Sequence, residues 1–257
     1  MMKTSSKFIL FCFLLTFFVL PKNTLAFKLG IITDIHAGNK NVDRESEYNK
    51  ANKLLAKQYA PYFKRALNQL KLQGVETFLT TGDNTSGNSS KYAKNLIKIA
   101  ARSGLETFWG KGNHDGSKTS RYFFPNGSYS FVDKNNWRII FLDSNQGVNN
   151  NTVGGINDSQ IEWLKAKIAE TSDSVLIVMH HPIFRIRDSL PDEVYPEYSR
   201  LEGALSESGK VKYVISGHAH LAYQFSKNLN GVQYYINPPL TIKKHLGGYQ
   251  ILDLPEN

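Results

Sequence analysis

Six of the seven histidines stand in short polar motifs with Asp, Asn and Gly. Each motif follows a run of β-branched or aromatic residues, where a strand is expected to end. Imidazole, carboxylate and amide groups are the ligands that first-row divalent metals prefer when no thiolate is offered. The sequence therefore predicts a metal site built from distant segments. The motifs are Asp34-Ile35-His36, Gly82-Asp83-Asn84, Gly112-Asn113-His114-Asp115, His180-His181-Pro182 and Gly217-His218-Ala219-His220.

Each motif alone also has an ordinary structural explanation. The Asp-x-His motif is compatible with an Asx turn, Gly-Asp-Asn is a common turn tripeptide, and His180 could be a core histidine that bonds to backbone. The Gly-Asn-His-Asp motif is harder to explain in this way, because the burial of such a polar run at the end of an apolar strand costs free energy. The five motifs together, each at an expected strand end, favour one joint metal site.

Strands and helices are expected to alternate along the chain, as in an α/β fold. Apolar groups at helical spacing predict a long helix over residues 44–72, which Pro61 is expected to kink or divide, and another over 92–101. Ser159 and Glu162 form a capping box that opens a third helix. The last two strands, 232–236 and 248–252, are expected to pair. The other expected strands are 28–33, 75–81, 106–110, 129–132, 137–142, 175–179 and 211–216.

The first 26 of the 257 residues differ in character from the rest. Lys3 and Lys7 precede an apolar run of roughly 13 residues over 8–20, shorter than a bilayer span requires. This pattern predicts a signal peptide over 1–26, a single domain over 27–257, and a secreted or periplasmic protein; an uncleaved anchor is the alternative. Cleavage would lower the formal net charge from +9 to +6 and remove Cys12, the only cysteine. No stable membrane span is expected after it.

The five motifs in this order resemble the signature of the calcineurin-like metallophosphoesterase superfamily. The resemblance spans residues 34–220. It implies a four-layer αββα sandwich, in which two mixed β-sheets are flanked by helices. It also implies a pair of divalent metal ions at the C-terminal ends of the strands.

The resemblance assigns roles to single residues. His114 would be the acid beside the substrate, and Asp115 would orient it. His181 would lie behind the ligands or line the pocket, and His245 is given no role. The first ion would be held by Asp34, His36, Asp83 and His220, and the second by Asp83, Asn113, His180 and His218.

The expected chemistry is hydrolysis of a phosphate ester by in-line attack of a hydroxide shared between the two ions. Two neighbouring dications need an anionic bridge, which Asp83 can supply, and water bound to them loses a proton near neutral pH. His114 can donate the proton that the leaving oxygen needs. Purple acid phosphatases have a tyrosine ligand where this chain has Ser86, which favours two divalent ions such as Mn, Zn or Fe(II).

The sequence favours an exported phosphoesterase that acts on small phosphate esters, and phosphodiesters over monoesters. Residues 160–164 are typical of the branch that includes bacterial cyclic-nucleotide and glycerophosphodiester phosphodiesterases. The export signal argues against intracellular signalling and for phosphate scavenging.

The alternatives are a phosphomonoesterase or phosphoprotein phosphatase, a nuclease suggested by the basic charge and a lysine-lined helix, and an inactive metal-containing binding protein. Nucleic acid is the less favoured partner, and the oligomeric state is left open. Substrate choice is expected to lie in residues 117–127, 145–157 and 186–200.

Overall fold

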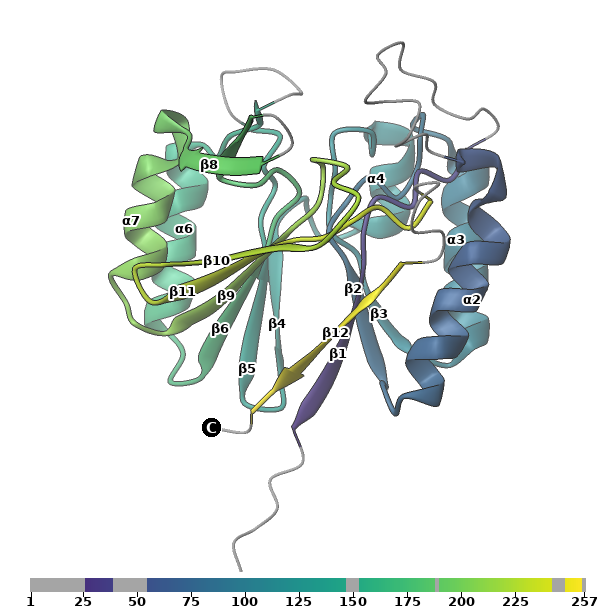
Figure 1. Ribbon diagram of the computed structural model, residues 1–257, viewed down its shortest axis with the longest axis horizontal. Helices are drawn as coiled ribbons and strands as arrows, with labels where there is room; N and C mark the ends of the chain where they lie inside the picture. Colours follow the sequence, from purple (N-terminus) through teal and green to yellow (C-terminus); the bar gives the residue numbers. More distant parts are fainter. Residues whose placement is uncertain (1–25, 39–54, 147–152, 188–189, 242–247, 256–257) are drawn as a thin grey trace, which may run out of the picture.

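Two β-sheets lie face to face in the computed structural model of the chain, and helices cover their outer faces (Figure 1). The structure describes residues 26–38, 55–146, 153–187, 190–241 and 248–255. Residues 1–25, which hold most of the predicted signal peptide, and His245 lie outside this part. Among the helices of the described ranges, none combines the length and apolar character that a bilayer crossing requires.

The first sheet has four strands in the order β12-β1-β2-β3. β1, β2 and β3 are parallel, and β12 joins the edge in the antiparallel direction. All four residues of β2 are buried, as expected of a strand covered on both faces. The strands are β1 (Phe27–Ile32), β2 (Thr77–Thr80), β3 (Glu106–Phe108) and β12 (Gln250–Leu254).

The second sheet has six strands in the order β10-β11-β9-β6-β5-β4. The four inner strands are parallel, and each edge strand is antiparallel to its neighbour. Both sheets are therefore mixed. The strands are β4 (Ser130–Lys134), β5 (Trp137–Phe141), β6 (Ser174–Val178), β9 (Val211–Ser216), β10 (Phe225–Leu229) and β11 (Val232–Ile236).

Helices α2 and α3 cover the first sheet, and α6 and α7 cover the second (Figure 1). The four layers that the family resemblance implied are confirmed. The helices are η1 (Ala56–Gln58), α2 (Tyr59–Leu72), α3 (Ser90–Ser103), α4 (Ser117–Phe123), α6 (Asp158–Ala169), η2 (Pro196–Tyr198) and α7 (Ser199–Ser206), and a small hairpin joins β7 (Phe184–Arg187) to β8 (Leu190–Val194).

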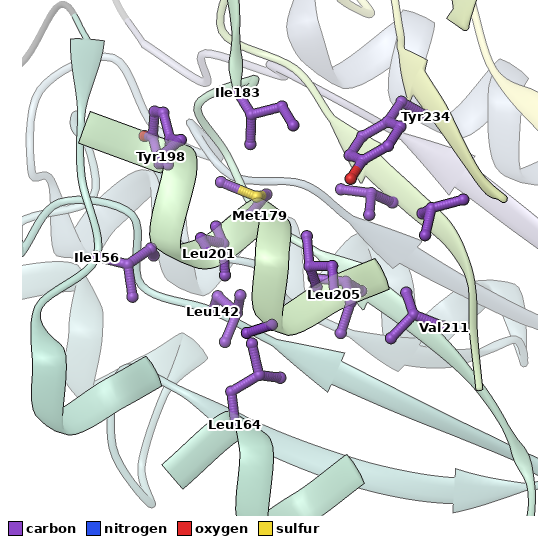
Figure 2. Packing of buried hydrophobic residues seen from close by; sticks show 14 of the residues in the cluster. Leu142, Ile156, Leu164, Met179, Ile183, Tyr198, Leu201, Leu205, Val211 and Tyr234 are labelled. Atoms are coloured by element: carbon purple, nitrogen blue, oxygen red, sulfur yellow. The ribbon is translucent and has the colours of Figure 1, made fainter. Parts of the chain in front are cut away.

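The apolar core fills all three interfaces between the layers. Figure 2 shows the interface under α6 and α7. Leu164, Leu201 and Leu205 belong there to the same buried cluster as Met179 and Val211. These side chains are almost fully buried. Burial of each such side chain contributes about 1.5–3 kcal/mol to folding, so the core holds the strand ends in fixed positions.

Several sequence-based expectations were wrong in detail. β11 and β12 do not pair: β11 lies between β10 and β9, whereas β12 pairs with β1 in the other sheet. α6 begins at Asp158, and its N-cap is Asn157 in place of the predicted Ser159; the Asn157 side chain accepts a hydrogen bond from Gln160 N. Pro61 lies in the first turn of α2, where its missing N–H leaves no helical bond broken; residues 44–54 of the helix that it was expected to kink or divide lie outside the described residues. Strands β7, β8 and β10 and helices α4 and α7 were not predicted.

Candidate metal centre

The predicted ligands come from strand ends of both sheets. Asp34 follows β1, Asp83 follows β2, and Asn113 lies in the loop after β3. His180 follows β6, and His218 follows β9 in the second sheet. Because parallel strands end at the same edge of a sheet and the sheets lie face to face, these side chains meet at one place.

The first donor group brings together Asp34, His36, Asp83 and His220. Nε2 of His36 lies 3.0 Å from Nε2 of His220 and 3.5 Å from Oδ2 of Asp83. Nε2 of His220 lies 3.4 Å from Oδ1 of Asp34. One ligand atom of each residue lies within 4.8 Å of those of the other three, a spacing at which one ion could bind them all.

The second donor group is centred on Nε2 of His180. This atom lies 3.0 Å from Oδ1 of Asn113, 3.2 Å from Nδ1 of His218 and 3.3 Å from Oδ2 of Asp83. Of the two neighbouring histidines His180 and His181, it is therefore His180 whose Nε2 lies among the other predicted ligands of this group. Oδ2 of Asp83 is common to both groups, which is the position that a bridging carboxylate requires.

Backbone hydrogen bonds fix the two carboxylates. Both oxygens of Asp34 lie within hydrogen-bond distance of N of His218, at 3.2 and 3.1 Å. Oδ1 of Asp83 accepts a bond of 2.9 Å from N of His114, which leaves Oδ2 turned toward the two donor groups. The backbone of another site residue thus sets the orientation of each carboxylate: that of His218 orients Asp34, and that of His114 orients Asp83.

Five of the seven predicted ligands have left-handed backbone. Among the described residues, nine that are not glycine have positive φ, and the other four are all asparagines. For Asp and His this conformation costs about 1–3 kcal/mol and persists where the surroundings enforce it. Such strain is concentrated at functional sites. The five are Asp34 (φ 48°), His36 (47°), Asp83 (48°), His218 (64°) and His220 (49°).

Glycines allow the motif loops to approach one another. A Cβ on Gly112 would lie 2.1 Å from both N and Oδ1 of Asp83. A Cβ on Gly217 would lie 2.2 Å from Oδ2 of Asp34 and 2.1 Å from Oγ1 of Thr33. These distances are far below any real contact, so the glycine in each motif is required by close packing against a predicted ligand.

Burial and neighbouring charges keep most of the donors in the unprotonated form that binds a metal ion. Burial alone would raise the pKa of Asp34 and Asp83, but the surrounding imidazoles lower both below the ordinary value. Burial lowers the pKa of His36 to about 3 and holds that of His218 well below its usual range, so both rings are neutral at pH 7. His180 differs from these two rings: burial opposes its protonation, but Asp83, Asp34 and Asp115 raise its pKa to about 9.

A family model described as calcineurin-like phosphoesterase matches residues 27–222. The chain belongs to this family. It is similar to a "Probable cyclic nucleotide phosphodiesterase" of Ruthia magnifica, with 25% identity over 64% of this chain and 70% of the relative. It is also similar to the "3',5'-cyclic adenosine monophosphate phosphodiesterase CpdA" of Escherichia coli K12, with 24% identity over 68% of this chain and 66% of the relative. A Rhodococcus erythropolis relative is 29% identical, and the chain covers about half, 51%, of its length.

Solved structures share the fold of this phosphoesterase. A dimetal phosphatase from Danio rerio superposes with a TM-score of 0.69 at 15% sequence identity, over 90% of this chain and 94% of the other. At this identity the likeness establishes the fold. The family match classifies this chain as a hydrolase of phosphate ester bonds.

The residues of this phosphoesterase suit two divalent ions. The seven donors are imidazole nitrogens, carboxylate oxygens and one amide oxygen, a set that Mn, Zn and Fe(II) accept. The first donor group is compact enough to surround one ion, and in the second group the donor atoms of Asn113, His218 and Asp83 lie within 3.3 Å of Nε2 of His180. Two carboxylates partly neutralise the added charge. The donor set alone does not choose among these metals.

His114 lies at the mouth of the site. Its side chain is 36% exposed, whereas those of His36 and His180 are buried. Nε2 of His114 lies 3.9 Å from Oδ2 of Asp83, and its ring centroid lies 5.1 Å from that of His36. The imidazole can therefore reach both the centre and a molecule that enters from solvent.

Asp115 has a different set of contacts from the one expected. Its carboxylate accepts bonds from N of Gly112, from N and Nδ2 of Asn84, and from N and Oγ1 of Thr85. No bond to His114 is among the contacts of the described residues. Asp115 thus fixes the segment that follows Asp83, in place of the predicted role of orienting His114. Burial and the charge of Asp83 raise the pKa of Asp115 to about 7.

The sequence interpretation missed a polar cluster beside the centre. Nζ of Lys111 lies 2.6 Å from Oδ2 of the buried Asp143, and this ion pair joins the loop after β3 to the loop after β5. The fully buried Gln160 holds the same loop through bonds to N and O of Asp143. The signal was present, because Asp143-Ser144-Asn145 is a polar run directly after an apolar strand, like the five motifs.

The loops expected to select substrates are only partly described. Residues 117–127 contain helix α4, and residues 186–200 contain the end of β7, β8 and η2. Residues 147–152 and 188–189 lie outside the described part. Substrate selection by these segments stays a prediction.

Proposed function

We propose that this phosphoesterase hydrolyses phosphodiesters, cyclic nucleotides among them, with two divalent ions. The observation that carries the proposal is the shared position of Oδ2 of Asp83, 3.5 Å from Nε2 of His36 and 3.3 Å from Nε2 of His180. One carboxylate oxygen between two compact donor groups is the arrangement that a two-metal hydrolase needs. Preference for diesters is supported by the similarity of the chain to relatives named as cyclic nucleotide phosphodiesterases.

Two divalent ions in these groups would supply a Lewis acid for the phosphoryl group and an activated water. The protein supplies the remaining requirements. Asp34 and Asp83 keep negative charge in a buried place, and Asp115 and Gly112 fix the loops that carry the donors. The metal centre and the exposed His114 lie side by side, so a phosphate ester bound at the centre has an imidazole next to its leaving oxygen.

His114 donates a proton to the leaving oxygen in this proposal. Its Nε2 faces Asp83 and its ring is open to solvent, which allows it to recover a proton after each turnover. An alkoxide such as the 3′-oxygen of a ribose is a poor leaving group without a proton. General acid catalysis therefore contributes most for cyclic nucleotides.

The proposed site of action is outside the cytoplasm. This part of the proposal is supported by the sequence of residues 1–26, with Lys3 and Lys7 ahead of an apolar run and Ala26 before β1. The substrate would then be an extracellular or periplasmic ester, and phosphate recovery the purpose. Detection of a mature chain that begins near residue 27 in the exported fraction would support export, and full-length protein confined to the cytoplasm would contradict it.

A substrate panel tests the activity. Purified protein loaded with Mn or Zn is assayed on 3′,5′-cyclic AMP, bis-p-nitrophenyl phosphate and p-nitrophenyl phosphate. The proposal predicts turnover of both diesters at higher kcat/KM than the monoester. The matched control is Leu72→Gln, which changes an exposed side chain at the end of α2 and should leave all rates unchanged. Higher kcat/KM on the monoester, or no turnover with either metal, would contradict the proposal.

A further inference from the structure

His181 is buried behind the second donor group and contacts two of its imidazoles. Its ring centroid lies 4.2 Å from that of His218 and 5.0 Å from that of His180. Its exposed fraction is 0%, and a ring nitrogen of each of the three histidines lies within 4.8 Å of those of the other two. His181 therefore forms part of the wall against which His218 rests.

Ser144 holds the His181 ring in place. Its Oγ accepts a bond of 3.1 Å from N of His181 and lies 2.8 Å from Nδ1 of the same residue. The Ser144 hydroxyl has one donor hydrogen and two acceptor lone pairs, so it can bond to the backbone N–H and to Nδ1 at the same time. One buried side chain thus fixes both the backbone and the ring of His181.

The backbone of Gly154 also packs against the His181 ring. A Cβ on Gly154 would lie 2.4 Å from Cγ and 2.5 Å from Nδ1 of His181, so its backbone packs directly on the ring. N of Gly155 donates a bond of 2.8 Å to O of Ser144, which ties this segment to the residue that anchors the ring. The His181 ring is therefore enclosed by a serine side chain, a glycine backbone and two predicted ligands.

We propose that Ser144 and His181 are positioning residues for the second metal ion. Ser144 fixes the His181 ring, and this ring holds His218 with Nδ1 toward His180, the atom that would bind the ion. The inference rests on the two-metal centre of the proposed function. It adds Ser144, to which the family signature assigns no role, and it gives His181 the specific role of holding His218. Residues that orient metal ligands typically change metal affinity about 10–100-fold when they are removed.

Cobalt binding tests the proposal without reference to activity. Wild-type protein, Ser144→Ala and Gly154→Ala are equilibrated with buffered Co²⁺; bound cobalt is measured by elemental analysis, and the visible absorption of each site is recorded. Both variants should bind the second ion at least about tenfold more weakly and lose or shift its absorption, while the first ion is retained. The matched control is Gly74→Ala: Gly74 has φ +77°, close to the +72° of Gly154, but a Cβ there meets no atom within 4 Å.

Three results would overturn the inference. Ser144→Ala could bind both ions with wild-type affinity and spectrum, Gly74→Ala could weaken the second ion as much as Gly154→Ala does, or wild-type protein could bind a single ion. If Ser144→Ala does not fold, the comparison of Gly154→Ala with Gly74→Ala decides by the same criteria. Wild-type protein that binds two ions but cleaves no phosphodiester would contradict the proposed function and leave this inference standing.

Discussion

Oδ2 of Asp83 lies 3.3 Å from Nε2 of His180, although Asp83 follows a strand of the first sheet and His180 a strand of the second. The same oxygen lies 3.5 Å from Nε2 of His36. The predicted centre therefore exists only where the two sheets meet, and its geometry depends on how they pack. Asp83 is the residue whose loss should affect both ions.

Asp83→Asn and Asp34→Asn should differ in their effect on metal content. Asp34 belongs to the first donor group alone, so its replacement should weaken one ion and leave the second. Asp83 is shared, so Asp83→Asn should weaken both, because each ion loses a charged ligand. Elemental analysis after equilibration with buffered Mn²⁺ measures the ratio of metal to protein. Two ions retained by Asp83→Asn would contradict a bridging role.

His114→Ala should reduce kcat on cyclic AMP about 100-fold or more, the usual size of a general-acid contribution. The reduction should be much smaller for bis-p-nitrophenyl phosphate, because p-nitrophenolate leaves without a proton. Metal content should stay at the wild-type value, since His114 is outside both donor groups. Equal losses on the two substrates would point to a binding role for His114 instead of proton transfer.

Metal binding should release a proton from His180. Its pKa is raised to about 9 in the metal-free site, so the ring is protonated at pH 7 and must lose that proton to bind an ion. Apparent affinity for the second ion should therefore rise as the pH increases toward 9 and level off above it. Titration calorimetry at pH 7 in buffers of different ionisation enthalpy measures the protons released. A heat that is independent of the buffer would contradict this assignment.

Lys111→Met should destabilise the fold through Asp143. The 2.6 Å ion pair joins a buried carboxylate to a lysine that is 20% exposed, so the variant leaves Asp143 without its main partner. The expected loss in free energy of unfolding at pH 7 is about 2 kcal/mol. The matched control is Lys165→Met, which removes an exposed pair with Glu162 at 3.7 Å and should cost at most about 0.5 kcal/mol.

The same pair predicts a pH dependence. Burial would raise the pKa of Asp143, but bonds from Lys111, Ser128 and Asn145 outweigh it and lower the pKa. A carboxyl with a lowered folded pKa stabilises the protein above its unfolded pKa of about 3.9 and loses that contribution as the pH falls further. The difference between wild type and Lys111→Met, measured by urea unfolding, should therefore shrink below about pH 4. A constant difference from pH 7 to pH 3 would contradict the role of Asp143.

Much of the site could be predicted because its residues follow apolar strands. The spacing of Asp34, Asp83, Asn113, His180 and His218 relative to those strands is a local pattern, and parallel strands bring their ends together. The left-handed backbone of His36 and His220 could not be predicted, because only a small minority of histidines have positive φ and tertiary contacts impose it here. Ser144 and His181 gave no decisive signal either, since their contact joins loops of two separate strands.

Strands buried on both faces were predicted, whereas an edge strand with a partly exposed pattern was missed. β6 is buried along its length and was expected. β10 alternates between half-buried and exposed residues at the edge of the second sheet and was overlooked. The pairing of β11 with β12 was wrong because both end the chain, but β12 completes the first sheet beside β1. Partner choice between sheets depends on long-range packing that sequence periodicity does not encode.

X-ray diffraction from crystals of manganese-loaded protein, with anomalous data collected near the manganese absorption edge, tests the central claim most directly. Two anomalous peaks are expected, one among Asp34, His36 and His220 and the other among Asn113, His180 and His218, with Asp83 in contact with both. A single peak, or two peaks of which only one contacts Asp83, would contradict a shared two-metal centre.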